Sequence, residues 1–204
     1  MRRKINTGLF VAAAALLLVM AWGNISGSML EATSDSDPSK TISIHANFVN
    51  FENADQLDSF ADLIVIGTAV QRFEERNPVS THFDDGTLQD FYTLTDISID
   101  KVLKGPEQIW QEDAPLTIIE PLAYLDIENE KTKLTRENYI ELYEGDKSVI
   151  FLKKNTFGQY AIINQNLGKF SLNETPEFQV TADNEEAAEY AILRKDVFEK
   201  YGLN

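Results

Sequence analysis

The clearest candidates for chemistry in this sequence are carboxylate side chains that alternate along one stretch of chain. Asp126, Glu128 and Glu130 are separated by single residues, and carboxylate oxygens are ligands that Ca²⁺ prefers in proteins. Their spacing is not that of an EF-hand loop, and carboxylates on an exposed strand are commonly just solvated. We therefore treat these three residues as the candidate metal ligands, with solvated surface charge as the alternative.

The sequence holds little else that catalysis requires. It has two histidines, His45 and His82, and no cysteine, which excludes a thiol nucleophile, a thiolate zinc site and a disulfide framework. No Gly-x-Ser-x-Gly elbow accompanies the histidines. We therefore expect no catalytic residue and no cofactor. A hydrolase that uses a pair of carboxylates, with or without calcium, stays open as an alternative.

Two aromatic residues are the candidates for a ligand platform. Trp110 follows a Lys-Gly-Pro turn, and Tyr124 falls within Pro121–Glu144, the longest stretch without a clear period between expected strands. Exposed rings stack well on ligands, and long loops on rigid scaffolds often carry function. We therefore predict that Trp110 and Tyr124 are exposed and contact a ligand. The alternative is that both rings belong to the core.

Alternating apolar and polar residues predict a mainly β fold. In the longest run, from Asp90 to Leu103, every second residue from Phe91 to Ile99 shares one face, which is the period of a half-buried strand. Gly67 interrupts another run and suggests a bulge. Short turns between the runs favour antiparallel pairing in a small barrel of five or more strands. The other expected strands cover residues 41–49, 62–76, 79–83, 115–120, 148–152, 159–164 and 170–172.

Two helices are expected at the ends of this run of strands. Asn53 can cap a short helix that continues to about Phe60. Asp183 and Glu186 have the spacing of a capping box, and helical periodicity continues from there until Gly202. The apolar face consists of Ala187, Tyr190, Ala191, Val197, Phe198 and Tyr201. It predicts that an amphipathic helix over residues 183–201 packs on the barrel.

The order of the segments from about Phe60 to Leu172 resembles the netrin-like family, which includes the tissue inhibitors of metalloproteinases. The matching pieces are ADLIVIGTAV, a long strand that runs on to DKVLKGPEQI, PLTIIEP, LYEGDKSVIFL and GQYAIINQNLGKF. The resemblance implies a closed five-stranded OB barrel. Inhibitors of that family grip the zinc of their target through an N-terminal cysteine. This chain has no cysteine, so the resemblance does not extend to that inhibition.

The N-terminus has the pattern of an export signal. Three basic residues at positions 2–4 precede an apolar run over residues 8–22, and no charge follows until Glu31. The run is shorter than the roughly 20 residues of a spanning helix, which favours cleavage over anchoring. We expect a signal peptide or membrane anchor over residues 1–28, a flexible acidic tether over 29–40 and the barrel domain over 41–204. The domain would then lie outside the cytoplasm, secreted or anchored.

The charge balance narrows the choice of partners. The chain has 33 acidic and 18 basic residues, for a net charge of −15. Loss of residues 1–28 would remove three positive charges and make the net charge −18. Such a surface repels phosphate backbones and anionic lipids. We therefore expect no nucleic acid partner, and membrane contact only through the N-terminal segment. Cations, basic proteins and neutral polymers remain possible ligands.

Together these patterns favour a non-catalytic binding or interaction module outside the cytoplasm, without specifying its ligand. One alternative is an extracellular proteinase inhibitor that acts through a rigid loop, for which Pro121–Glu144 is the candidate. The other is the carboxylate- or calcium-dependent hydrolase, which would act on wall polymers.

Overall fold

The computed structural model describes residues 40–44, 51–106, 109, 114–173 and 184–203. The predicted signal or anchor over residues 1–28 and nearly all of the tether lie outside the described residues, as do His45 and Trp110. Within the described part of the chain, no helix has both the length and the apolar character needed to cross a membrane.

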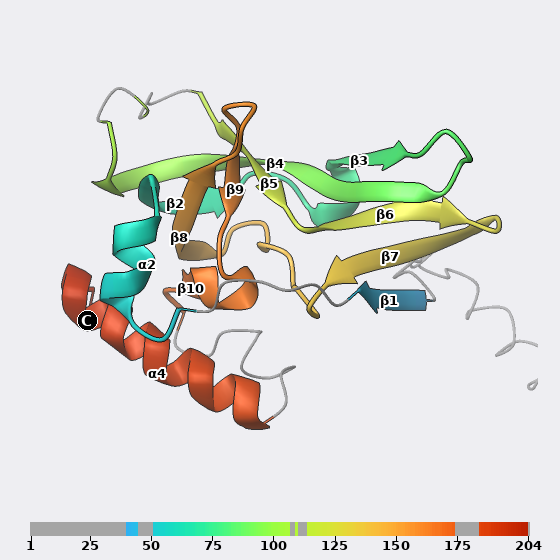
Figure 1. The fold of residues 1–204 in the computed structure, drawn as a ribbon. Helices are drawn as coiled ribbons and strands as arrows, with labels where there is room; N and C mark the ends of the chain where they lie inside the picture. The colour runs from blue at the N-terminus through green and yellow to red at the C-terminus, as the bar shows by residue number, and fades with distance from the viewer. Residues whose placement is uncertain (1–39, 45–50, 107–108, 110–113, 174–183, 204) are drawn as a thin grey trace, which may run out of the picture. The chain divides into compact units, whose positions relative to one another are not determined.

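The centre of the fold is a closed, OB-like barrel of five strands (Figure 1). Around the barrel the hydrogen-bonded order is β2, β4, β5, β9, β8 and back to β2. The first four strands in chain order thus have the Greek-key arrangement, with the fourth beside the first. Most pairs are antiparallel, but β5 and β9 are parallel. The strands are β2 (Leu63–Ala69), β4 (Leu88–Lys104), β5 (Leu116–Glu120), β8 (Lys147–Lys154) and β9 (Tyr160–Ile162).

Strand β2 is buried on both of its faces, as its nearly continuous apolar sequence requires. Leu63 and Val65 pack inside the barrel, while Ile64 and Ile66 pack against the helices. The bulge predicted at Gly67 is confirmed, because the register against β4 shifts there. A Cβ atom at this glycine would lie 2.9 Å from the carbonyl oxygen of Ser98, so the close approach of the two strands requires glycine.

The segment after β2 differs from the sequence prediction. The strand expected over residues 62–76 ends at Ala69, and the chain then forms a 3₁₀ turn, η1 (Phe73–Glu75). Strand β3 (Asn77–His82) follows and pairs with the first half of β4. Asn77 and Pro78 therefore belong to a strand, although the Asn-Pro dipeptide is a turn signal. The segment between the first two barrel strands is therefore η1 followed by a β3–β4 hairpin.

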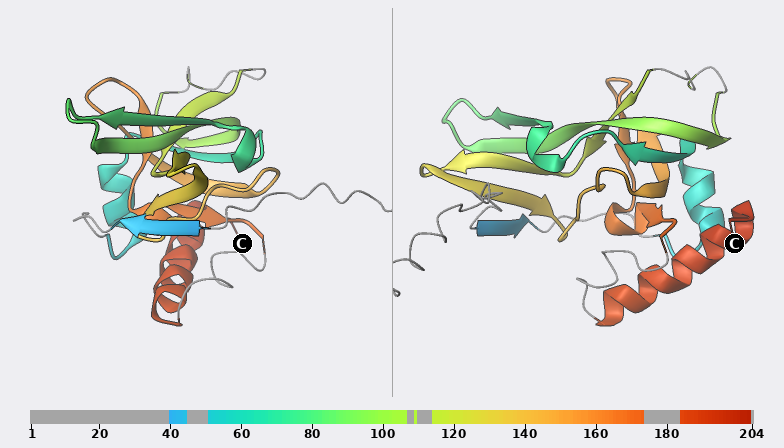
Figure 2. Two further views of the ribbon diagram at one scale, coloured as in Figure 1. Left: turned by 90° about the vertical axis from the view of Figure 1, so that its right-hand side faces the viewer. Right: turned by 180° about the vertical axis from the view of Figure 1, so that it is seen from behind.

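Two helices cover the outer face of β2 and β8 (Figures 1 and 2). Helix α2 (Ala54–Phe60) begins as predicted, with the Asn53 side chain accepting a hydrogen bond from the amide of Gln56 at 2.9 Å. Helix α4 (Asn184–Tyr201) packs on the barrel through Tyr190, Leu193, Val197 and Phe198. Two details of its predicted apolar face were wrong: Ala191 is exposed, and the buried Leu193 was not included.

The stretch predicted as the longest irregular loop, Pro121–Glu144, is wrong in its first half, where it forms a β-hairpin. Strand β6 (Leu122–Ile127) pairs with β7 (Glu130–Arg136), and β1 (Lys40–Ile44) adds to β7 in parallel. Figure 1 shows this hairpin beside β3 and β4, at the end of the domain away from α2 and α4. The short strand β10 (Lys169–Ser171) and the 3₁₀ turn η3 (Gln165–Gly168) complete the described fold.

Candidate functional site

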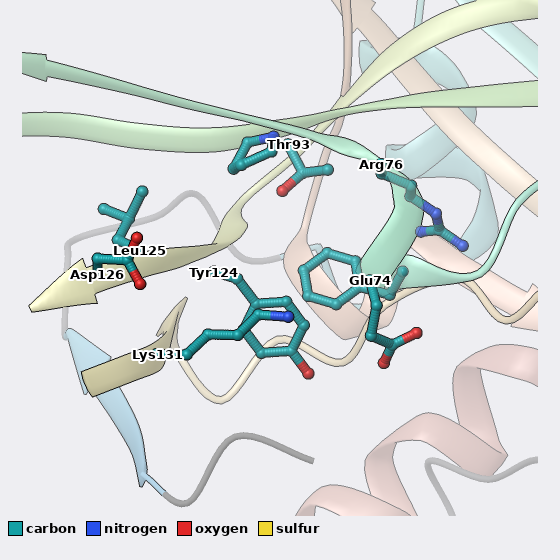
Figure 3. Close-up of a pocket in the computed structure, with 9 residues that line it drawn as sticks. Glu74, Arg76, Thr93, Tyr124, Leu125, Asp126 and Lys131 are labelled. Carbon is teal, nitrogen blue, oxygen red and sulfur yellow. The ribbon is translucent and has the colours of Figure 1, made fainter. Parts of the chain in front are cut away.

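A pocket of about 260 Å³ lies where the β6–β7 hairpin meets the segment between the first two barrel strands (Figure 3). Side chains from η1, β3, β4, β6 and β7 converge on it, so segments far apart in sequence build one hollow. Its lining consists of Phe73, Glu74, Arg76, Pro78, Thr93, Tyr124, Leu125, Asp126 and Lys131.

Two aromatic rings form the deep part of the pocket. The rings of Phe73 and Tyr124 lie 4.8 Å apart between centroids at an angle of 51°, and both residues are buried, at 5% and 9% exposure. Their faces attract cations of this same chain. The ammonium of Lys131 lies 4.6 Å from the Tyr124 ring centroid, and that of Lys133 lies 5.2 Å from the Phe73 centroid. The aromatic pair therefore already shows cation–π chemistry.

The rim of the pocket is charged and exposed. Glu74 and Asp126 contribute carboxylates and Lys131 an ammonium group, and all three residues are exposed. Asp126 lies opposite Lys131 in the register of the hairpin. Lys133 does not add to the free charge of the rim, because its ammonium pairs with Glu141 at 2.6 Å. The pocket thus combines an aromatic floor with polar groups at its edge, as ligand sites commonly do.

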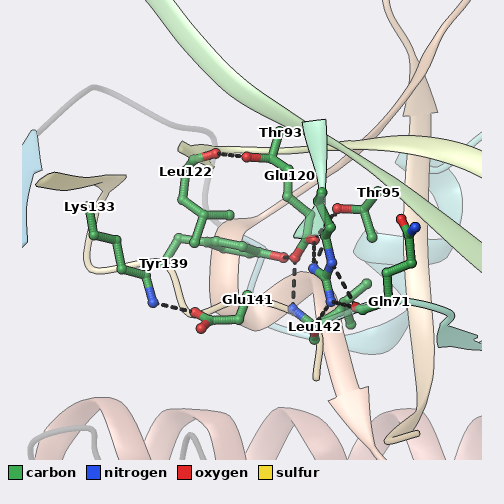
Figure 4. A network of polar contacts seen from close by, with 10 residues as sticks. Gln71, Thr93, Thr95, Glu120, Leu122, Lys133, Tyr139, Glu141 and Leu142 are labelled. Atoms are coloured by element: carbon green, nitrogen blue, oxygen red, sulfur yellow. Dashed lines mark hydrogen bonds and ion pairs between the residues drawn. The ribbon is translucent and has the colours of Figure 1, made fainter. Parts of the chain in front are cut away.

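A buried polar network fixes the floor of the pocket from below (Figure 4). Arg76, which lines the pocket, forms an ion pair with Glu120 at 2.6 Å, and the two side chains are 1% and 0% exposed. The Glu120 carboxylate also accepts hydrogen bonds from the Thr95 hydroxyl at 2.5 Å, the Tyr139 hydroxyl at 2.8 Å and the Leu142 amide at 2.8 Å. Thr95 belongs to β4, whereas Tyr139 and Leu142 both belong to the segment between β7 and β8.

The Arg76 side chain also links two backbone segments beside the pocket. Arg76 donates to the carbonyl oxygens of Gln71 at 2.8 Å and Leu142 at 2.5 Å. These bonds join the segment before η1 to the segment after β7. Since Phe73 lies between Gln71 and Arg76, the network sets the position of one of the two floor rings.

Two titratable groups beside the network have shifted pKa values. Burial, reinforced by the charge of Glu120, raises the pKa of the Tyr139 hydroxyl well above its usual value and keeps it protonated as a donor. Burial lowers the pKa of Lys169 to about 8, against the opposing effect of the Glu120, Glu141 and Asp146 charges. The Lys169 ammonium lies 5.1 Å from the centroid of the Tyr139 ring.

Of the two aromatic residues predicted to contact a ligand, only Tyr124 is among the residues that the structure describes. Tyr124 lines the pocket, but the prediction that it is exposed was wrong, because the ring packs between Phe73 and Lys131 and is 9% exposed. Trp110 lies outside the described residues. His82 is exposed in β3 and does not line this pocket.

The predicted calcium ligands lie on the β6–β7 hairpin. Asp126 is the next-to-last residue of β6, Glu128 and Asn129 form the turn, and Glu130 is the first residue of β7. Of the three, only Asp126 lines the pocket. In the part of the chain that the structure describes, no three His, Asp or Glu side chains are grouped so that they could hold a metal ion.

The residues that sequence reasoning missed are Phe73, Glu74, Arg76 and Lys131. Phe73 was assigned to a strand, although the polar residues around it are a weak signal of a turn. Arg76 and Glu120 lie 44 positions apart, and no local pattern links two residues at that separation.

No family model matches the chain, and no curated protein matches it either.

Proposed function

We propose that this chain is an exported, non-catalytic binding module built on a netrin-like OB barrel, and that it takes its ligand in the pocket between Phe73 and Tyr124. The export assignment rests on the basic and apolar pattern of residues 2–22, and the netrin-like assignment on the order of the five matching segments. The closed barrel with its Greek-key strand order agrees with the second assignment.

The observation that carries the proposal is the position of the pocket on the barrel. In OB folds the ligand face includes the second and third strands and the loop between the first and second. Here that loop contributes Phe73, Glu74 and Pro78, and the second barrel strand contributes Thr93. The β6–β7 hairpin supplies the opposite wall. A ligand in this pocket would contact the surface that OB barrels commonly use.

The buried network supports binding because it prepares the pocket in advance. A site that is already ordered loses less conformational entropy when a ligand enters. Arg76 and Glu120 hold the η1 segment against the barrel through hydrogen bonds to four further residues, which are Gln71, Thr95, Tyr139 and Leu142. The floor rings are therefore fixed while the charged rim stays open to solvent.

The proposal is tested with a ligand-observed NMR screen of amino acids, short peptides and cell-wall oligosaccharide fragments. We expect at least one class to bind without being converted, and Thr93→Val together with Pro78→Ser to weaken that binding. Formation of a new product from any fragment would contradict the non-catalytic assignment. Binding that the two substitutions leave unchanged would contradict the assignment of the pocket.

A further inference from the structure

We infer that the pocket is a receptor for a basic side chain, lysine or arginine, of a polypeptide partner, and that the chain's own Lys131 occupies the site until the partner displaces it. This inference rests on the proposed function, since it names the ligand class for the same pocket. It follows from the charges of the lining and from where Lys131 lies.

The aromatic floor selects for a cation. Lys131 and Lys133 approach the Tyr124 ring centroid to 4.6 and 6.0 Å, and Lys133 and Arg76 approach the Phe73 centroid to 5.2 and 5.6 Å. The electron-rich face of an aromatic ring attracts ammonium and guanidinium groups. Four contacts of this kind at two rings show which ligand charge the floor accommodates.

The carboxylates decide the net charge of the pocket. Arg76 is neutralised by Glu120 and Lys133 by Glu141, each at 2.6 Å. Within the described chain, Lys131 forms no ion pair within 4.0 Å with a carboxylate, and it is the one cation of the lining not neutralised in this way. Asp126 and Glu74 remain on the rim, with Glu74 in an exposed ion pair with Arg72 at 3.7 Å. When Lys131 swings away, the open pocket is left with the Asp126 carboxylate and this exposed Glu74 carboxylate around an aromatic floor.

Lys131 is well placed to give way to a competitor. It is exposed and lies next to the hairpin turn at Glu128 and Asn129, so its ammonium can move into solvent by giving up its contact with the Tyr124 ring and without breaking an ion pair. A cation–π contact at an exposed site is a weak interaction. A partner's lysine can therefore replace it and gain the rim carboxylates as well.

The charge of the whole chain favours the same partner. The sequence carries a net charge of −15, which raises the local concentration of basic polypeptides and speeds their association. The charges of the pocket and the net charge of the chain thus both favour a basic protein or peptide outside the cytoplasm as the occupant.

The test is fluorescence anisotropy with labelled hexalysine as the probe, and with ε-acetylated hexalysine and hexaglutamate for comparison, at about 0.15 M salt. We expect hexalysine to bind and the other two peptides not to bind. Lys131→Thr, which keeps a β-favouring residue in β7 and removes the internal competitor, should tighten hexalysine binding by about two- to fivefold. Glu74→Gln with Asp126→Asn should weaken it by about fivefold.

A matched control separates pocket binding from general attraction. Glu189→Gln with Glu199→Gln also removes two carboxylates, but from the exposed face of α4, outside the pocket lining. It should change hexalysine binding by less than about twofold at this salt concentration. Equal weakening by the two double variants would overturn the inference.

The remaining outcomes distinguish this inference from the proposed function. Binding of hexaglutamate that is lost in Lys131→Thr would overturn the basic-ligand inference while the pocket remained the binding site. Equal binding of acetylated hexalysine would also overturn it, because charge would then not be recognised. If fragments of other classes bind elsewhere and no peptide depends on the pocket, both the inference and the proposed function fail.

Discussion

Replacing Glu120 by alanine removes the acceptor at the centre of the buried network. The carboxylate is 0% exposed and receives hydrogen bonds from Arg76, Thr95, Tyr139 and the Leu142 amide. In the variant the Arg76 guanidinium stays buried without its counter-charge. The hydroxyl and amide donors lose their partner at the same time.

The expected cost follows from these contacts. Removing one member of a buried ion pair costs about 3–5 kcal/mol, and each buried donor left unsatisfied adds about 1 kcal/mol or more. We expect Glu120→Ala to lower the free energy of unfolding by at least about 4 kcal/mol. With a urea m-value of about 2 kcal/mol/M, the unfolding midpoint falls by about 2 M.

The assay is urea unfolding at 15 °C followed by circular dichroism, with a double-mutant cycle. Arg76→Met combined with Glu120→Leu should be less destabilised than the sum of its single variants, with a coupling energy of about 2 kcal/mol. Some destabilisation remains in the double variant, because the carbonyl oxygens of Gln71 and Leu142 lose the donors that Arg76 supplied.

An exposed ion pair serves as the control. Lys195 and Glu199 are 3.6 Å apart on α4 with side chains 77% and 58% exposed, so Glu199→Ala should cost less than about 1 kcal/mol. The role of the network in holding the pocket would be refuted if Glu120→Ala cost as little as the control. It would also be refuted if the destabilisations of the two single variants added up to that of the double variant within about 0.5 kcal/mol.

Three further predictions concern other parts of the fold. Burial lowers the pKa of Lys169 to about 8 from 10.5. The charged form therefore destabilises the folded state below pH 8, and this penalty is relieved as the pH rises from about 8 to 10.5. In urea titrations Lys169→Met should be more stable than the wild type at pH 7 by about 1–3 kcal/mol, and the difference should shrink at pH 10. If the difference does not depend on pH, the buried ammonium is not its cause. Gly67→Ala should lower the melting temperature measured by calorimetry, by a destabilisation of about 1–3 kcal/mol, because its Cβ would lie 2.9 Å from the Ser98 carbonyl oxygen; an unchanged melting temperature would mean that β4 shifts freely. Asn53→Ala should cost about 1 kcal/mol in the same assay, since the Gln56 amide loses its cap, and Asn53→Asp should restore most of it.

Local periodicity predicted the barrel strands and both helices well. In β4, alternate residues Phe91, Thr93, Thr95 and Ile97 are buried as the sequence pattern indicates, because one face of this strand meets the core and the other does not. The pattern could not show which strands close the barrel. The parallel pairing of β5 with β9 joins residues about 40 positions apart, which no turn signal marks.

The β6–β7 hairpin was missed for a reason that lies in its turn. Glu128 and Asn129 have φ angles of 54° and 65°, a conformation that hairpin turns usually fill with Asn-Gly or Asp-Gly. A glutamate at the first of these positions gives no turn signal. Without the turn, Leu122–Ile127 and Glu130–Arg136 did not stand out as paired strands.

The candidate site was predicted only in part, through Tyr124 and Asp126. Each residue was chosen for a different chemistry, a stacking platform in one case and a calcium site in the other, and the structure brings both into one pocket. Phe73 and Arg76 reach the same place from a segment whose position depends on the ion pair with Glu120. Contacts set by tertiary packing of this kind leave no period in the sequence.

The most direct test of the central claim is an amide chemical-shift map of the protein titrated with hexalysine. The account predicts that the largest shifts cluster at residues 73–78 and 124–131, and that the Lys131→Thr variant reaches saturation at a lower peptide concentration. Shifts spread along the exposed face of α4, with the amides of residues 73–78 and 124–131 unmoved, would contradict it.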